Sequence, residues 1–138
     1  MKILQICNKT PYPPKDGGSL ASWMLTKGLV SQGDTVHILT INTQKHYVEN
    51  PQIPSHIKDK VSLNSVQTDT DIKLSGLIHN FLFSRLPYNI ERFWCERFNN
   101  ELISILNKNH FDMVLLEGLP LALYIETIRQ YFTGKLVM

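Results

Sequence analysis

Two adjacent glycines close a proline-rich loop near the start of the sequence, and their position suits a negatively charged ligand. Gly17 and Gly18 end the segment TPYPPKDGG and stand directly before the apolar-periodic stretch that begins at Ser19. The first N–H groups of a helix have no partner within the helix, and the helix dipole makes that end positive, so a phosphate would be stabilised there. Spacing alone leaves open the alternative that the two glycines only make a turn.

A carboxylate and a further glycine follow a second apolar run, FDMVLLE, in the turn Glu117-Gly118-Leu119. A carboxylate at this place can accept hydrogen bonds from hydroxyl groups or take up a proton. We therefore treat Glu117 as a candidate substrate contact and candidate catalytic residue, with Gly118 as a substrate contact beside it. The alternative interpretation is that Glu117 is an acidic strand end exposed to water.

Other phosphate and metal motifs do not occur in the sequence. The loop after the first apolar run has neither the G-x-G-x-x-G of dinucleotide sites nor the G-x-x-x-x-G-K-[ST] of P-loops, so neither NAD nor ATP is indicated. That run ends in Cys7-Asn8-Lys9 and lacks the acidic residues of a response regulator. The histidines and cysteines lack metal-ligand spacing, and Asp69 and Asp71 lie in a polar connection. We expect no metal and no cofactor.

Apolar runs alternate with helical patterns along the chain. The runs predicted as strands cover residues 2–7, 36–41, 61–66, 111–117 and 135–138, and the patterns predicted as helices cover residues 19–32, 72–84, 89–109 and 120–132. Ser19 or Gly18 is expected to cap the first helix, and Gly33 to end it. A strand, a helix and a strand in succession force parallel pairing with a right-handed crossover. The predicted fold class is α/β, a Rossmann-like parallel sheet with helices on both faces.

This topology predicts where the candidate residues lie. In an open parallel sheet, ligands bind at the carboxyl ends of the strands. The loop 8–19, the segment after Ile41 and the turn 117–119 each follow a predicted strand. We therefore expect the glycine pair and Glu117 to share one edge of the sheet.

Composition is that of an ordinary globular domain. The 138 residues are 43% hydrophobic and 19% charged, which suits one domain over residues 1–138, and a net charge of +2 with scattered basic residues gives no reason to expect nucleic acid. No apolar run approaches the about 20 residues that span a bilayer, and the start MKILQIC is too short for a signal peptide. We expect a cytoplasmic protein with at most a peripheral contact at the inner face of the membrane. Because the last apolar run stops at Met138, we expect the fold to continue beyond it.

Three segments resemble the N-terminal domain of glycosyltransferase family 4, retaining enzymes with the two-domain GT-B fold. They are the opening KILQICNKTPYPPKDGGSLASWMLTKGLVSQGDTVHILT, the segment SRLPYNIERF and the strand-turn-helix FDMVLLEGLPLALY. The opening resembles the family's strand, its loop with prolines and two glycines, its helix and its lead into a second strand, where Asp34 replaces the usual histidine. The resemblance covers nearly the whole chain, and its first segment is the most specific.

The resemblance implies one half of a GT-B architecture, which binds a saccharide or lipid-linked acceptor and serves polysaccharide biosynthesis. A C-terminal domain outside residues 1–138 would bind the donor, a nucleotide-diphosphate sugar, and would carry a pair of glutamates, so that this part alone would be inactive. Gly17 and Gly18 match the glycine loop that approaches the donor diphosphate, where N–H groups as far as Ser19, aided by Lys15, would stabilise its charge. Glu117 stands where many members have a histidine, and a carboxylate cannot donate a hydrogen bond to a leaving phosphate.

Two alternatives stand beside the transferase. One is another sugar-nucleotide enzyme of the same fold, such as an epimerase. The other is a non-catalytic Rossmann-like module that presents the aromatic and basic segment 84–98, with Arg92, Arg97 and Trp94, to a partner or a membrane. The same spacing suits an amphipathic helix packed into the core, which is the interpretation we favour.

Overall fold

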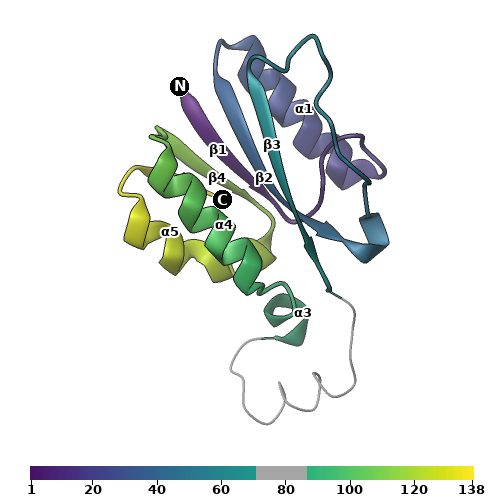
Figure 1. Ribbon diagram of the computed structural model, residues 1–138, viewed down its shortest axis with the longest axis vertical. Coiled ribbons are helices and arrows are strands. Elements are labelled where there is room, and N and C mark those ends of the chain that lie inside the picture. Colours follow the sequence, from purple (N-terminus) through teal and green to yellow (C-terminus); the bar gives the residue numbers. More distant parts are fainter. Residues whose placement is uncertain (71–86) are drawn as a thin grey trace.

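A five-stranded parallel sheet forms the centre of the computed structural model, which describes residues 1–70 and 87–138 (Figure 1). Its strands are β1 (Lys2–Cys7), β2 (Thr35–Thr43), β3 (Val61–Thr68), β4 (Met113–Glu117) and β5 (Lys135–Val137). They lie in the order β3-β2-β1-β4-β5, and each neighbouring pair is parallel. The predicted α/β class with a Rossmann-like sheet is confirmed. The helix predicted for residues 72–84 lies outside the described residues.

The central strand, β1, ends level with its neighbour β4. Residues 3–7 are buried, as expected for a near-continuous apolar run covered on both faces. Its last residue, Cys7, pairs with Thr40 of β2 and with Glu117 of β4. The segments that follow β1 and β4 therefore start side by side at the carboxyl edge of the sheet.

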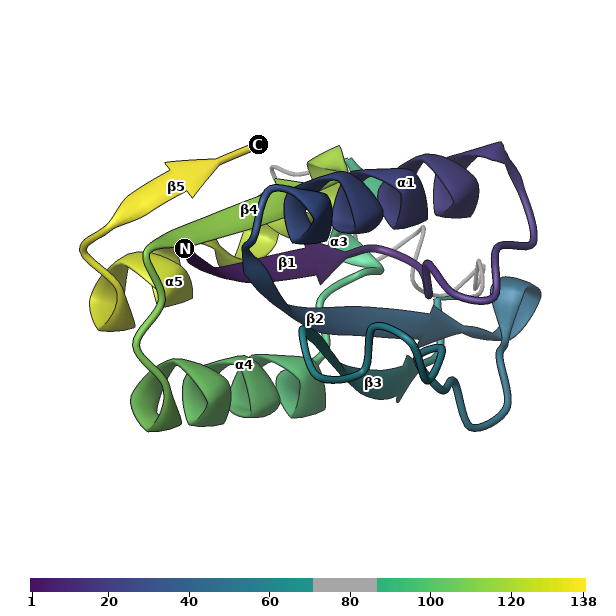
Figure 2. The ribbon, with the colours of Figure 1, turned by 90° about the horizontal axis from the view of Figure 1, so that it is seen from above.

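Helices cover both faces of the sheet, as predicted (Figure 2). Helix α1 (Gly17–Ser31) lies on one face, where Trp23 packs in a small cluster with residues of β1, β2 and β3. Helices α4 (Glu96–Lys108) and α5 (Ile125–Tyr131) lie on the other face, over the larger core cluster. The buried apolar residues of α4 recur at helical spacing and are Phe98, Leu102, Ile105 and Leu106. Burying side chains of this size stabilises the fold by about 1.5–3 kcal/mol each.

The start of α1 differs from the prediction, because Asp16 caps this helix in place of Ser19 or Gly18. The Asp16 carboxylate accepts a hydrogen bond from the Ser19 N–H at 2.8 Å, and the Ser19 hydroxyl accepts one from the Asp16 N–H at 3.0 Å. This reciprocal pair is a capping box, and it lets the helix begin at Gly17. The end of the helix is as predicted, since Gly33 has a φ of 93°.

The single helix predicted for residues 89–109 is also wrong, since the structure has α3 (Tyr88–Glu91) and α4 with a break between them. The buried hydroxyl of Tyr124 accepts a hydrogen bond from the Cys95 N–H at 2.9 Å and donates one to the Phe93 carbonyl at 2.8 Å. These backbone groups are therefore unavailable to a continuous helix. A local pattern could not show the break, because Tyr124 is 29 residues from Cys95.

Two short 3₁₀ helices complete the described elements. They are η1 (Gln44–His46), after β2, and η2 (Leu119–Tyr124), after β4. Pro120 lies in the first turn of η2, and the single helix predicted for residues 120–132 is divided into this 3₁₀ helix and α5. Within residues 1–70 and 87–138, no helix is both long enough and apolar enough to cross a bilayer.

Candidate functional site

The two glycines of the β1–α1 loop are exposed at the carboxyl edge of the sheet. A Cβ added to Gly17 would have no atom within 4 Å, so a side chain at this position would extend into open space. Helical hydrogen bonding begins with the Leu20 N–H, which donates to the Asp16 carbonyl at 2.9 Å. The N–H groups of Gly17 and Gly18 consequently have no acceptor among the described residues, and an anion could bind both.

Gly18 has a second, structural reason to be a glycine. A Cβ there would lie 2.7 Å from Nζ of Lys9, which donates to both carboxylate oxygens of Asp16 at 2.9 and 3.0 Å. The hydrogen bond from the Ser19 N–H, followed by that from Lys9, holds the pKa of Asp16 well below its usual range. Asp16 is therefore charged and offsets the charge of Lys9. The positive potential that remains at this helix end comes from the N–H groups of Gly17 and Gly18.

The other two residues predicted for this loop are occupied by contacts within the protein. Ser19 is buried, its N–H donates to Asp16 and its hydroxyl accepts from the Lys15 N–H at 2.9 Å. The ammonium group of Lys15 donates to the carbonyl of Tyr47, after β2. Of the three N–H groups predicted to face a diphosphate, only the two glycine N–H groups are open.

Gly118 and the β1–α1 loop meet at the same edge. Gly118 has a φ of 117°, a backbone region that favours glycine. A Cβ on Gly118 would lie 2.8 Å from the amide nitrogen of the Asn8 side chain, so Asn8 packs directly against it. The turn after β4 and the loop after β1 are thus neighbours, as the topology predicts.

The Glu117 carboxylate belongs to a polar network between the sheet and α1. It accepts hydrogen bonds from the Ser22 hydroxyl of α1 at 2.5 Å and from the side-chain amide of Gln5 on β1. Gln5 is fully buried and accepts in turn from the Thr26 hydroxyl at 2.7 Å. Glu117 is therefore half-buried with both oxygens engaged, in contrast to the exposed strand end of the alternative interpretation. Its catalytic role stays a prediction.

The same network keeps Cys7 protonated. Burial raises the pKa of the Cys7 thiol well above its usual value, and the neighbouring Glu117 charge raises it further. The thiol lies 3.8 Å from a Glu117 oxygen. Because the thiolate is the nucleophilic form of cysteine, Cys7 is a structural residue at neutral pH.

A hollow of about 230 Å³ opens at the carboxyl edge beside the glycine loop, and we call it the carboxyl-edge hollow. The loop after β1, the end of β2 and η1 supply Asn8, Lys9, Thr43, Lys45 and His46. Thr70, after β3, and the pair Arg92 and Phe93, after α3, complete the lining. Nδ1 of His46 lies 3.4 Å from the Asp16 carboxylate. The hollow therefore adjoins the capped start of α1.

Sequence reasoning missed this hollow. It placed the segment after Ile41 at the ligand edge but assigned no residue within it. The buried Asn42 positions that segment, because its side chain donates to the Val48 carbonyl at 2.8 Å and accepts from the Val48 N–H at 3.0 Å. An asparagine at the end of an apolar strand, followed by the basic pair Lys45 and His46, is the signal that could have found it.

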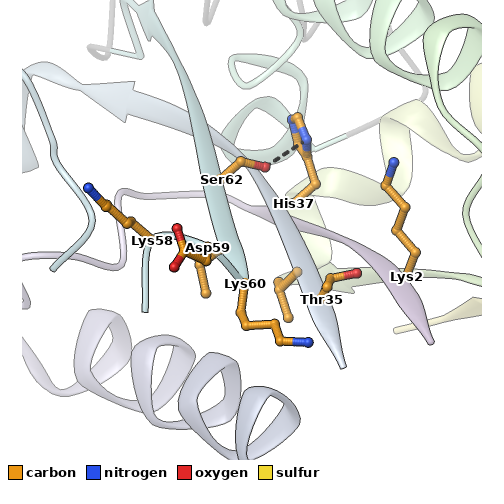
Figure 3. A pocket seen from close by; sticks show the side chains of 9 residues that line it. Lys2, Thr35, His37, Lys58, Asp59, Lys60 and Ser62 are labelled. Atoms are coloured by element: carbon orange, nitrogen blue, oxygen red, sulfur yellow. Dashed lines mark hydrogen bonds between the residues drawn. The ribbon is translucent and has the colours of Figure 1, made fainter. Parts of the chain in front are cut away.

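A second hollow, of about 130 Å³, lies at the opposite, amino edge, and we call it the amino-edge hollow (Figure 3). Its lining includes Lys2, Lys58, Asp59 and Lys60. His37 also lines it, with Nδ1 of its ring 3.0 Å from the Ser62 hydroxyl. Helices end at this edge with the negative end of their dipoles, and ligands of open parallel sheets bind at the other edge. We therefore place the candidate site at the carboxyl edge.

The described residues offer no cluster of metal ligands. Within residues 1–70 and 87–138, no three side chains of histidine, cysteine, aspartate or glutamate gather closely enough to hold a metal ion.

Comparison of the chain with protein-family models, with curated proteins and with solved structures found no match.

Proposed function

We propose that this chain forms the acceptor-side half of a retaining GT-B glycosyltransferase, which moves a sugar from a nucleotide-diphosphate sugar to a saccharide or lipid-linked acceptor. The observation that carries the proposal is the pair of N–H groups of Gly17 and Gly18, which stand at the carboxyl edge and have no acceptor among the described residues. The turn of Glu117 and Gly118 lies at the same edge, which supports the proposal.

In this proposal the N–H groups of Gly17 and Gly18 stabilise the charge that develops on the leaving diphosphate. A hydrogen bond to a charged group contributes about 1.5–3 kcal/mol, which corresponds to a rate factor of roughly 10 to 150. The Glu117 carboxylate contacts the acceptor, or takes its proton, in exchange for one of its hydrogen bonds with Ser22 or Gln5.

A pair of variants in α1 tests the proposal. Gly17→Val puts a side chain into the open space before the unpaired N–H groups. Gly28→Val adds the same side chain to the same helix, at an exposed position where an added Cβ also has no atom within 4 Å. In the intact protein, with labelled UDP-glucose and GDP-mannose as first donors, we expect Gly17→Val to lower kcat/KM for transfer about tenfold or more, and Gly28→Val to leave it unchanged.

Gly18 is a less informative position, because a side chain there would displace the ammonium group of Lys9. Equal transfer by the Gly17→Val and Gly28→Val variants would contradict the placement of the diphosphate. Conversion of a nucleotide sugar without any acceptor would favour the epimerase alternative. Binding to lipid vesicles that is lost on replacing Arg92 and Arg97, with no response to nucleotide sugars, would favour the binding module.

A further inference from the structure

The carboxyl-edge hollow is lined by basic side chains that take no part in the proposed donor site. Lys9, Lys45 and Arg92 line it together with His46, and no carboxylate is among its described lining residues. Asp16 pairs with Lys9, whereas Lys45 has no ion pair within residues 1–70 and 87–138. The charge of Lys45 on this concave surface attracts an anion.

Hydrogen bonds hold one basic group of the hollow in place and order the turn that carries another. The Arg92 guanidinium donates to the Thr70 carbonyl at 2.9 Å, which joins the segment after α3 to the segment after β3. The side chain of Asn42 holds the turn that contains Lys45. Groups that are already ordered lose less conformational entropy when a ligand binds, so these contacts favour binding.

The hydroxyl of Thr43 gives a second, independent indication of a ligand. Thr43 lines the hollow and is only 5% exposed. Its Oγ1 has no hydrogen-bond partner among the described residues. A buried hydroxyl without a partner destabilises the fold, and an anion oxygen in the hollow would supply the missing acceptor.

The size of the hollow limits what it can hold. At about 230 Å³ it is smaller than the roughly 300–1,000 Å³ of sites that enclose a whole drug-sized ligand. A single charged group fits better than a complete nucleotide. Phosphate suits lysine, arginine and hydroxyl donors because it presents several oxygens that accept hydrogen bonds.

We infer that the carboxyl-edge hollow binds a phosphate group of the acceptor, so that the acceptor is a phosphorylated sugar, either free or linked to a lipid. This inference rests on the proposed function and names its substrate class. It gives the edge two anion positions, with the donor diphosphate at Gly17 and the acceptor phosphate between Thr43, Lys45 and Arg92.

Calorimetric titration of the intact protein with inorganic phosphate and with glucose 6-phosphate tests the inference. Lys45→Gln should weaken the binding of both probes about tenfold, and Thr43→Val, which replaces a hydroxyl by a methyl group, should weaken it several-fold. The matched control is Lys58→Gln at the amino-edge hollow, which should stay within about twofold of the native affinity. Thermal unfolding of each variant checks that the fold is intact.

Two further measurements distinguish the source of the phosphate. Tighter binding of glucose 6-phosphate than of inorganic phosphate, lost in Lys45→Gln, supports a free sugar phosphate. Binding to vesicles that contain phosphatidic acid, lost in Lys45→Gln but not in Lys58→Gln, supports a lipid-linked acceptor. The inference is overturned if phosphate does not bind at millimolar concentration, or if Lys58→Gln weakens binding as much as Lys45→Gln.

The two proposals can fail separately. Phosphate binding that depends on Lys45, in a protein that transfers no sugar, would refute the transferase and leave the hollow as an anion site. In the second case, Gly17→Val lowers sugar transfer, but Lys45→Gln transfers the sugar equally well to an unphosphorylated acceptor. The transferase proposal would then stand. That second result would overturn the acceptor phosphate.

Discussion

The two edges of the sheet carry similar numbers of basic side chains but differ in what surrounds them. Three lysines line the amino-edge hollow, yet Asp59 lines it with them. The same edge holds Asp34, whose carboxylate lies 2.7 Å from the N-terminal amine, and Asp112, which accepts from the Lys2 N–H at 2.6 Å. At the carboxyl edge no carboxylate is among the described residues that line the hollow, although Asp16 beside it pairs with Lys9. A count of lysines therefore does not tell the edges apart.

The direction of the backbone distinguishes the two edges of the sheet. Parallel strands with crossover helices place helix N-termini at the carboxyl edge and helix C-termini at the amino edge. The unpaired N–H groups of Gly17 and Gly18 occur at the first edge, whereas α1 and α4 end before β2 and β4 begin at the second. We therefore expect basic side chains to form an anion site where backbone dipoles add to their potential.

The largest effect is expected at Glu117, whose carboxylate connects the end of β4 to β1 and α1. Glu117→Ala leaves the amide of Gln5 and the hydroxyl of Ser22 without their acceptor and should lower the free energy of unfolding by about 2–3 kcal/mol. Glu117→Gln keeps polar atoms at the same place and should stay within about 1 kcal/mol of the native protein. Urea unfolding followed by tryptophan fluorescence measures both.

The matched carboxylate of the amino edge is Asp34. Its partner is the N-terminal amine of Met1, whose side chain is 58% exposed. Asp34→Asn should therefore lower the free energy of unfolding by less than about 1 kcal/mol. A loss as large as that of Glu117→Ala would erase the difference between the edges. If Glu117→Gln keeps its stability but lowers kcat for transfer, the carboxylate acts in the reaction, and unchanged kcat would leave it a structural role alone.

An intermediate effect is expected at Tyr124, which ties residues 93–95 to η2 and so helps to position one wall of the carboxyl-edge hollow. Burial raises the pKa of Tyr124, so the hydroxyl keeps its proton and both of its hydrogen bonds at neutral pH. Tyr124→Phe should lower the free energy of unfolding by about 1–2 kcal/mol and weaken phosphate binding. Tyr131→Phe, at an exposed tyrosine of α5, is the control. Unaltered phosphate affinity in Tyr124→Phe would show that this wall is positioned by other contacts.

The smallest effect is expected at His37 in the amino-edge hollow. Burial, as the largest cause, lowers the pKa of His37 from its ordinary value of 6.5. The folded protein therefore binds fewer protons at this residue than the unfolded chain, so its contribution to stability is present above about pH 6.5 and is lost as the pH falls through the lowered pKa. His37→Gln should show a shallower loss of stability on acidification, measured as urea midpoints at neutral and at mildly acidic pH. Identical slopes in the native protein and in His37→Gln would mean that His37 has the same pKa in the folded and the unfolded state.

Parts of the fold followed from local patterns. The run Lys2–Cys7 is a strand because it is apolar without helical periodicity and is followed by prolines, and Gly33 ends α1 because the chain needs a positive φ there. The start of α1 did not follow, since Ser19 and Asp16 are both good capping residues and each can stand first. The break at residues 92–95 did not follow either, because the amphipathic pattern continues across it.

The sequence by itself determined the α/β class, the parallel sheet and the shared edge of the loop 8–19 and the turn 117–119. Apolar periodicity and the length of the connections decide these features, and both are local. Only the tertiary structure decided which polar groups at that edge remain open. Ser19 is bound to Asp16, and Glu117 to Ser22 and Gln5, while the glycine N–H groups have no acceptor among the described residues and the basic hollow stays open. The reason is that most of these partners come from distant elements, and whether two polar atoms meet at hydrogen-bonding distance depends on how the layers pack.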